Sequence, residues 1–200
     1  MLYGTGYIQA ELDGTEHKIE LDLFDVPEEY SYIGAMPPVL DQGSSSKCVC
    51  YSLTGILDWK VNRFKGTNSS NGFDIDKLYE QRANKNIDGM QIKEALKYLR
   101  HTGLNGTTIE SYAMVGSSEL MKRTLILYGP IAIGLPAYED SGDDFWNGRN
   151  LAGGHCVVVI GYNKDGFIIR NSWGKNWADK GHVLLPYKDF DKIFEAWTII

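Results

Sequence analysis

The chain is poor in cysteine, in positive charge and in long apolar runs. Its three cysteines are too few, and odd in number, for the disulfide framework of a small secreted protein. The net charge of −6 and the scattered Lys and Arg residues leave no basic surface for nucleic acid or for an anionic membrane. No apolar run approaches the ~20 residues that a bilayer-spanning helix needs. We therefore expect a globular protein without a nucleic-acid or membrane partner.

The N-terminal sequence MLYGTGYIQAELDGTEHK also lacks the cationic start and the apolar stretch of a secretory signal. Together with the scarcity of cysteine, this favours a reducing, cytoplasmic setting. With 200 residues, 43% of them apolar, the chain is long enough for one large domain or for two small lobes around a shared core. We expect it to work as a monomer.

Apolar periodicity divides the chain into three parts. Alternating apolar residues on both sides of Asp13-Gly14 predict an N-terminal β-hairpin over 1–25. Apolar residues at helical spacing predict helices over 48–66, around Tyr79, over 92–103 and over 118–128. Short β-branched and aromatic runs predict strands over 130–135, 155–162, 167–173, 182–187 and 196–200.

This order of elements predicts an α+β fold over 26–200. A helical lobe over about 40–110 would face an antiparallel β lobe over about 111–200, with a cleft between them. The hairpin could belong to either lobe. The first long helix should bury a stripe made of Leu53, Ile56, Leu57, Val61 and Phe64. Its candidate N-caps are Ser44, Ser45 and Ser46.

Two of the three cysteines lie close together in DQGSSSKCVCYS, residues 41–52. A zinc site needs four ligands, which Cys48, Cys50, His155 and Cys156 could nominally supply. Next-nearest neighbours on a helix do not face each other, however, and adjacent residues on a strand point to opposite faces. A Cys48–Cys50 disulfide would be strained. We therefore expect no metal or cofactor, and we expect Cys50 and Cys156 to be buried core residues.

Cys48 differs because a Ser-rich loop meets the first turn of a helix there. Unpaired N–H groups and the positive end of the helix dipole favour a thiolate, the nucleophilic form of cysteine. Such a nucleophile also needs a histidine, and a third group to orient that histidine. His155 ranks first, because it follows two glycines at the mouth of an apolar strand. His182 is not excluded by its pattern, whereas His17 and His101 fit a charged turn and a helix end.

Three segments, in this order, together resemble the papain family of cysteine peptidases. PPVLDQGSSSKCVCYS resembles the segment around the nucleophile, with Gln42 six residues before Cys48. GGHCVVVIGY resembles the histidine strand, and IIRNSWGKNWADKGHVLLP resembles the Asn-Ser-Trp-Gly segment. The likeness covers roughly 26–200, and it implies a papain-like fold that acts on peptide or protein substrates.

The resemblance implies a role for each residue that matches these segments. Cys48 would attack a peptide carbonyl, and His155 would serve as its general base and acid. Asn171 would hold the imidazole, Gln42 would donate to the oxyanion, and Trp173 would cover the Asn171–His155 hydrogen bond.

The substrate-binding residues follow from the same resemblance. Gly89 would pair its backbone with an extended substrate, as an added strand. Gly154, together with Met90 and Gly134, would border a roomy apolar pocket for the second residue before the cut.

The sequence departs from the family pattern near the nucleophile and upstream. Val49 replaces the usual aromatic residue, and Ser45 stands where a disulfide cysteine is usual. No long helical pro-segment precedes the mature-like start, so we expect the usual zymogen control to be absent. The hairpin at 5–23 could instead dock beside the cleft as a short substitute pro-segment.

One geometric problem and two alternative functions remain open. A tight turn at 163–166 would place Asn171 near Val158 rather than His155, so a bulge or another strand partner is required. The chain could be a non-catalytic module that grips a peptide, although the set of Cys48, His155, Asn171 and Gln42 argues against that. It could also be another Cys-dependent acyl transferase or amidase.

Overall fold

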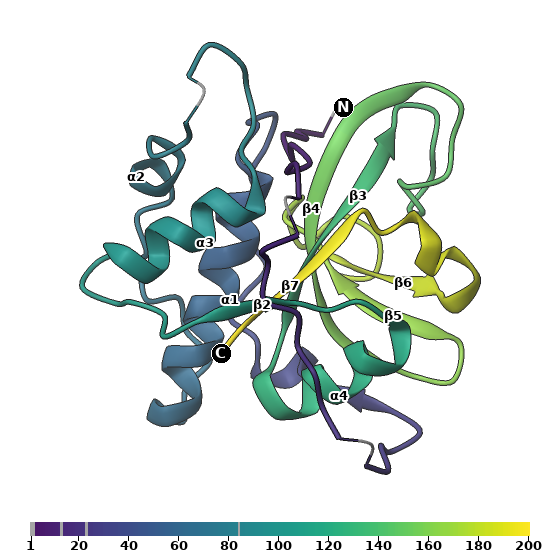
Figure 1. The fold of residues 1–200 in the computed structure, drawn as a ribbon. Coiled ribbons are helices and arrows are strands. Elements are labelled where there is room, and N and C mark those ends of the chain that lie inside the picture. The colour runs from purple at the N-terminus through teal and green to yellow at the C-terminus, as the bar shows by residue number, and fades with distance from the viewer. Residues whose placement is uncertain (1–2, 13, 23, 84) are drawn as a thin grey trace.

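The computed structural model describes residues 3–12, 14–22, 24–83 and 85–200. Helices lie on one side and a β-sheet on the other, and the N-terminal segment runs between them (Figure 1). This confirms the α+β arrangement expected from the sequence. Within the described ranges, no helix is both long and apolar enough to cross a membrane.

The helical lobe is built on α1 (Cys48–Lys65), against which α2 (Ile75–Tyr79) and α3 (Ile92–His101) pack. Helix α1 ends at Gly66, whose left-handed backbone (φ 65°) is the conformation that glycine adopts at a C-cap. The N-caps expected at 44–46 are wrong, because Lys47 holds the N-cap position and no side chain caps the helix. Phe64 is 80% exposed and not part of the buried stripe, because only Asn62 is buried in the last turn of α1.

The β lobe is one antiparallel sheet in the order β2-β7-β3-β4-β5-β6, with β1 added beside β4. Its strands are β1 (Tyr30–Ser31), β2 (Tyr112–Met114), β3 (Ile131–Tyr138), β4 (Leu151–Tyr162), β5 (Gly166–Arg170), β6 (His182–Pro186) and β7 (Glu195–Ile199). Helix α4 (Ser118–Tyr128) packs on this sheet, and two short 3-10 turns cover 33–35 and 187–192. The strands β1 and β2 were not expected, since two or three residues show no alternation.

Strand β4 joins the cores of the two lobes. Cys156, Val158 and Ile160 belong to the apolar cluster that includes α1, whereas Val157 and Val159 belong to the cluster on the other side of the sheet. Successive residues of a strand point to opposite faces, so this division is what a fully buried strand requires. The catalytic candidates of the two halves therefore meet along β4.

The predicted N-terminal β-hairpin is wrong. Tyr7 bridges to Met90 and Gly154, and Lys18 bridges to Met114, so the two halves of the segment pair with the rest of the protein. Asp13 and Leu23, which that prediction used, lie outside the described residues. A lone two-stranded hairpin is only marginally stable, and partners on both lobes replace it. Residues 3–12 and 14–22, hereafter the strap, run in the space between the lobes (Figure 1).

Candidate active site

The candidate triad is assembled around His155, an interior residue of strand β4. Nε2 of His155 lies 2.7 Å from Oδ1 of Asn171, and both side chains are buried. The same Oδ1 accepts the Ser172 N–H at 2.7 Å, which fixes the side-chain amide. Of the candidate histidines, His155 is the one bonded to Asn171; His182 instead lies on β6, with Nδ1 3.3 Å from the Asp179 carbonyl.

A β-bulge in β4 is what brings Asn171 to the histidine. The β4–β5 pairing runs from Tyr162↔Phe167 to Val158↔Arg170, and it shifts by one residue between Val159 and Gly161. Without that shift, Asn171 would stand opposite Val158, on the face away from His155. With it, Asn171 follows the end of β5 on the His155 face. The bulge that the hairpin geometry required is therefore present.

Aromatic rings shield the imidazole from water. Trp173 stacks on His155, with ring centroids 4.5 Å apart and an interplanar angle of 20°. Phe145 meets the same ring edge-on at 5.2 Å, and Trp177 packs edge-on against Trp173. Because these rings exclude water, no solvent molecule competes for the His155–Asn171 hydrogen bond. That bond therefore holds the imidazole ring in one orientation.

Cys48 is the first residue of α1, and its side chain is fully buried. Its Sγ accepts the N–H of Cys156 at 3.4 Å, which places the thiol beside the histidine strand. Nδ1 of His155 has no hydrogen-bond partner among the residues that the structure describes, so no hydrogen bond joins the imidazole to the thiol.

Burial keeps both of these groups uncharged. It raises the pKa of the Cys48 thiol to about 12, despite the N–H groups around it. It lowers the pKa of His155 to about 4, against a smaller opposing effect of the Asn171 hydrogen bond. At neutral pH the structure therefore contains Cys48 as a thiol and His155 as a neutral imidazole. Attack on a carbonyl requires the thiolate.

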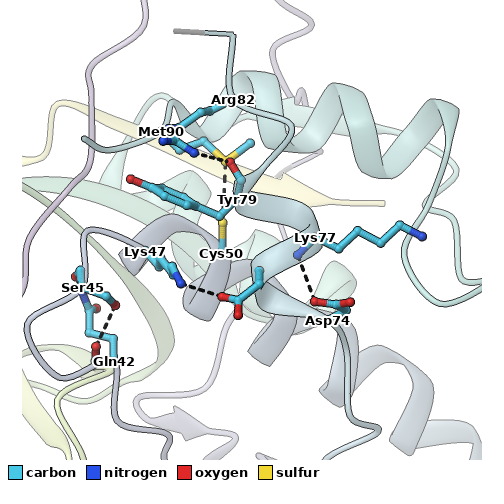
Figure 2. Close-up of polar contacts among 10 residues, drawn as sticks. Gln42, Ser45, Lys47, Cys50, Asp74, Lys77, Tyr79, Arg82 and Met90 are labelled. Atoms are coloured by element: carbon cyan, nitrogen blue, oxygen red, sulfur yellow. Dashed lines mark hydrogen bonds and ion pairs between the residues drawn. The ribbon is translucent and has the colours of Figure 1, made fainter. Parts of the chain in front are cut away.

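Gln42 is held with its amide N–H₂ toward the cleft. Ser172 Oγ donates to its Oε1 at 2.6 Å, so the nitrogen must point the other way. Nε2 then donates to the Ser45 carbonyl at 2.7 Å, a bond that Figure 2 draws, and to the Gly4 carbonyl at 3.1 Å. Since Gly4 belongs to the strap, the second bond is one that a substrate oxygen could take over.

The strap fills the cleft next to these groups. Gly4 O also accepts the indole N–H of Trp173 at 2.9 Å. Two residues on, the Gly6 and Tyr7 N–H groups both donate to the Gly154 carbonyl, at 3.0 and 2.9 Å. The chain segment in front of the candidate catalytic groups is therefore held on both sides, as an added strand would be.

The strap pairs with the backbone of Met90 rather than with that of Gly89, which stays a prediction for the substrate. The Met90 N–H donates to Gly6 O at 2.8 Å, and Met90 O accepts the Ile8 N–H at 3.1 Å. Gly89 has another role: its N–H donates to the Tyr79 hydroxyl, and a Cβ on it would lie 2.5 Å from Gly6 O. Gly154 pairs with the strap directly, as a substrate-binding residue would.

The other two cysteines are core residues. All three cysteines are free thiols, and Cys50 and Cys156 are fully buried. Figure 2 shows Cys50 pointing toward Met90, with 3.6 Å between the two sulfur atoms. Burial raises the pKa of both thiols, which keeps them protonated and unreactive.

Sequence reasoning missed Ser172 and Glu195 as parts of the site. Ser172 lies inside the recognised Asn-Ser-Trp-Gly segment, and its place next to Asn171 was a usable signal. Glu195 is a buried acid at the start of the apolar strand β7, and it accepts the Tyr7 hydroxyl at 2.9 Å. A charged residue heading an apolar run was the only sign of it in the sequence.

Residues 54–192 match the family model described as papain family cysteine protease. The chain is 28% identical over 212 aligned positions to cysteine proteinase 3 of Entamoeba histolytica, covering 88% of this chain and 68% of that protein. It is 26% identical to a cathepsin L-like peptidase of Aedes aegypti, over 75% of this chain and 55% of the relative. The chain thus spans about half to two thirds of the length of such relatives.

Solved structures show the same fold. Xylellain, a cysteine protease from Xylella fastidiosa, superposes with a TM-score of 0.82 at 21% identity, over 98% of this chain and 96% of that one. A procathepsin B from Trypanosoma congolense gives 0.79 at 14% identity, over 98% and 86%. The fold is therefore papain-like, and the chain belongs to the papain family of cysteine proteases.

Proposed function

We propose that this chain hydrolyses peptide bonds, with Cys48 as nucleophile and His155 as its proton carrier. The observation that carries the proposal is the 2.7 Å contact from His155 to Asn171, buried under Trp173 and adjacent to a cysteine at a helix N-terminus. These three parts perform the three tasks of nucleophilic catalysis, which are attack, proton transfer and orientation of the base.

The reaction begins when a substrate replaces the strap. The Cys48 proton passes to Nδ1 of His155, which has no other partner, and the thiolate sulfur forms a bond to the peptide carbonyl carbon. The carbonyl oxygen then carries negative charge. Gln42 Nε2 donates to it from the position where it now donates to Gly4 O, and the first N–H of α1 adds a second donor.

Collapse of this intermediate breaks the C–N bond. His155 gives its proton to the departing amine, and the acyl group remains on Cys48 as a thioester. Water then gives a proton to His155 and attacks the thioester, which releases the carboxylic acid and returns the thiol. Asn171 keeps the ring in place through both steps, because its Oδ1 accepts from Nε2–H while Nδ1 exchanges the proton.

The strap is proposed to keep the enzyme in a closed, inactive form. It covers the candidate catalytic groups, contacts both lobes and occupies the Gln42 and Trp173 donors. Farther along, Glu16 pairs with Lys93 of α3 at 2.5 Å, and Ile19 is buried in the core of the β lobe. This is the substitute pro-segment suggested by the sequence, in the form of an extended chain.

The proposed setting is a single chain in a reducing compartment such as the cytoplasm. Cys48, His155, Asn171 and Gln42 all come from one chain, so catalysis requires no second copy. Three unpaired thiols support a reducing environment. Size-exclusion chromatography coupled to light scattering would test the monomer, and the location would be tested by fractionating the source cells.

The peptidase proposal is tested on the full chain carrying Tyr7→Ala, which opens the cleft. We expect this protein to cleave a peptide library and to react covalently with an epoxide thiol inhibitor. Adding Cys48→Ala should abolish both, whereas adding Cys50→Ala, the matched control, should spare both. Equal labelling of the two double variants would contradict the assignment of the nucleophile.

A further inference from the structure

Three unpaired thiols gather where the first turn of α1 meets β4. Cys48, Cys50 and Cys156 belong to one core cluster, and each is fully buried. Cys48 and Cys50 are two positions apart on a helix, so their side chains point in different directions. Figure 2 shows Cys50 directed toward Met90. The remaining thiol, Cys156, is therefore the candidate neighbour of the Cys48 thiol.

Cys156 lies against the first turn of α1. It follows His155 in β4, so its side chain points to the opposite face, where it joins the cluster that includes α1. Its N–H donates to Cys48 Sγ at 3.4 Å, and its carbonyl accepts the Ser52 hydroxyl at 3.0 Å. A hydrogen bond of the Ser52 side chain also acts on the Cys156 thiol, lowering its pKa against the larger effect of burial. The backbone and the sulfur of Cys156 thus both contact the helical turn that begins at Cys48.

The side chains of Cys48 and Cys156 are within the reach of a disulfide. The N and Cβ atoms of a residue are both bonded to its Cα, so Cβ of Cys156 lies within about 6 Å of Cys48 Sγ. In disulfides, the two Cα atoms are usually about 4.4–6.8 Å apart. A bond between these sulfurs would therefore require rotation of the two side chains, while α1 and β4 keep their contact.

An oxidant reaches Cys48 once the strap leaves the cleft. With the strap in place, burial raises the pKa of the Cys48 thiol to about 12, so little thiolate forms. In the proposed open form, His155 takes the thiol proton, and the thiolate is the form of cysteine that peroxides oxidise. Cys156 stays buried in the open form, because its cover comes from α1 and β4 rather than from the strap.

We infer that Cys156 is a resolving cysteine, which converts peroxide-oxidised Cys48 into a reversible Cys48–Cys156 disulfide. The inference rests on the proposed function for the reactivity of Cys48. The Cys48 thiolate attacks one oxygen of hydrogen peroxide, the O–O bond breaks, and the departing hydroxide takes the proton from His155 to give water. Cys156 then attacks the sulfur of this sulfenic acid: the S–S bond forms, the S–O bond breaks, and the Cys156 proton leaves with the oxygen as a second water. The two thiols lose two electrons, and the peroxide gains them.

Proximity compensates for the raised pKa of Cys156. Toward reagents in solvent this thiol is unreactive, because burial keeps it protonated. Toward a sulfenic sulfur held beside it, the reaction is intramolecular, and orientation replaces the concentration that a thiol in solution would need. The disulfide blocks the nucleophile, and it also prevents further oxidation of Cys48 to the irreversible sulfinic acid. A reducing thiol would then restore the enzyme.

The test uses the full chain with Tyr7→Ala, treated with hydrogen peroxide and digested after the free thiols are blocked. We expect a linked Cys48–Cys156 peptide pair, a chain lighter by two hydrogen atoms, and recovery of inhibitor labelling at Cys48 after dithiothreitol. Adding Cys156→Ala should abolish the link and raise the yield of Cys48 sulfinic acid by about 10-fold. Adding Cys50→Ala, the matched control, should leave the link and the recovery unchanged. Cys156→Ser, which keeps a polar group beside Ser52, repeats the test if thermal unfolding shows that the alanine variant is not folded.

Each product of the oxidation decides the matter. A Cys48–Cys50 link, a Cys48 that stays a free thiol, or an equal yield of sulfinic acid with and without Cys156 would overturn the inference. So would a loss of two hydrogen atoms that persists in Cys156→Ala, because it would indicate a sulfenamide with a backbone nitrogen. Peptide cleavage by the unoxidised protein is measured separately, so none of these results touches the peptidase proposal. A Cys48–Cys156 link in a protein that cleaves no peptide would contradict the peptidase proposal alone.

Discussion

Closure of the cleft by the strap predicts that Cys48 is protected in the intact chain and is exposed by substitution of Tyr7. Truncating a buried aromatic residue to alanine costs about 3–5 kcal/mol. At about 1.4 kcal/mol for each factor of ten, the closed form loses more than about 100-fold in its equilibrium. Tyr7→Phe removes only the hydroxyl that binds Glu195, and this should shift the equilibrium by about 10- to 100-fold.

The measured quantity is the second-order rate of covalent labelling of Cys48 by an epoxide inhibitor, followed by intact mass. That rate is proportional to the fraction of open molecules. We expect the order wild type, then Tyr7→Phe, then Tyr7→Ala, with an upper limit once the cleft is fully open. Leu12→Ala is the matched control, because Leu12 is a half-exposed strap residue and its loss should change the rate little.

Equal labelling rates for the wild type and Tyr7→Ala would refute the reasoning. The strap would then exchange too freely to protect the thiol, whatever its contacts in the closed form. A rate increase with Leu12→Ala as large as with Tyr7→Ala would also count against it, because the effect would not depend on the Tyr7 side chain.

Three further predictions concern single contacts. Ser172→Ala should lower kcat about 10-fold in the open variant, because Gln42 loses the bond that orients its amide, and Gln42→Ala should lower it about 100-fold or more. An unchanged kcat in Ser172→Ala would mean that the Ser45 contact alone orients the Gln42 amide. Gly134→Val should increase labelling of Cys48 by iodoacetamide yet reduce peptide cleavage, since its side chain would enter the space of both the strap and the substrate; parallel changes in the two assays would contradict a shared pocket. The pKa of His155 is lowered from 6.5 to about 4, so the unfolded chain binds the extra proton first, and stability should fall by about 3 kcal/mol as the pH drops from about 6.5 to about 4. The raised pKa of Glu195 acts in the opposite sense, so the decisive comparison is with His155→Gln, in which urea unfolding should lack most of this loss.

The helices and strands whose apolar residues recur at regular spacing could be predicted from the sequence. The helix from Cys48 to Gly66 and the strands of the second half have buried residues at regular spacing, and they form within a few residues of where they were expected. The candidate triad also followed from local signals and from family resemblance. Its assembly depends on one β-bulge, which was required by geometry before it was observed.

The N-terminal segment could not be predicted because its partners are remote. Alternation around Asp13-Gly14 is compatible with a hairpin, but the competing partners Met90, Met114 and Gly154 lie 83 or more positions from the strap residues that they pair with. Local propensity carries no information on such contacts. The same holds for Gly89 and Met90, where the choice of the pairing residue depends on a one-residue register that only the folded cleft defines.

The bulge between Val159 and Gly161 makes the site depend on whether a change in chain length is odd or even. Removing or adding one residue within the paired parts of β4 and β5 would turn Asn171 to the opposite face of the sheet. Two residues would restore the face but would slide Asn171 by about 6–7 Å along the strand. The length of the chain can therefore vary at the connection around 163–165. Within the paired parts of β4 and β5, the number of residues between His155 and Asn171 must stay fixed.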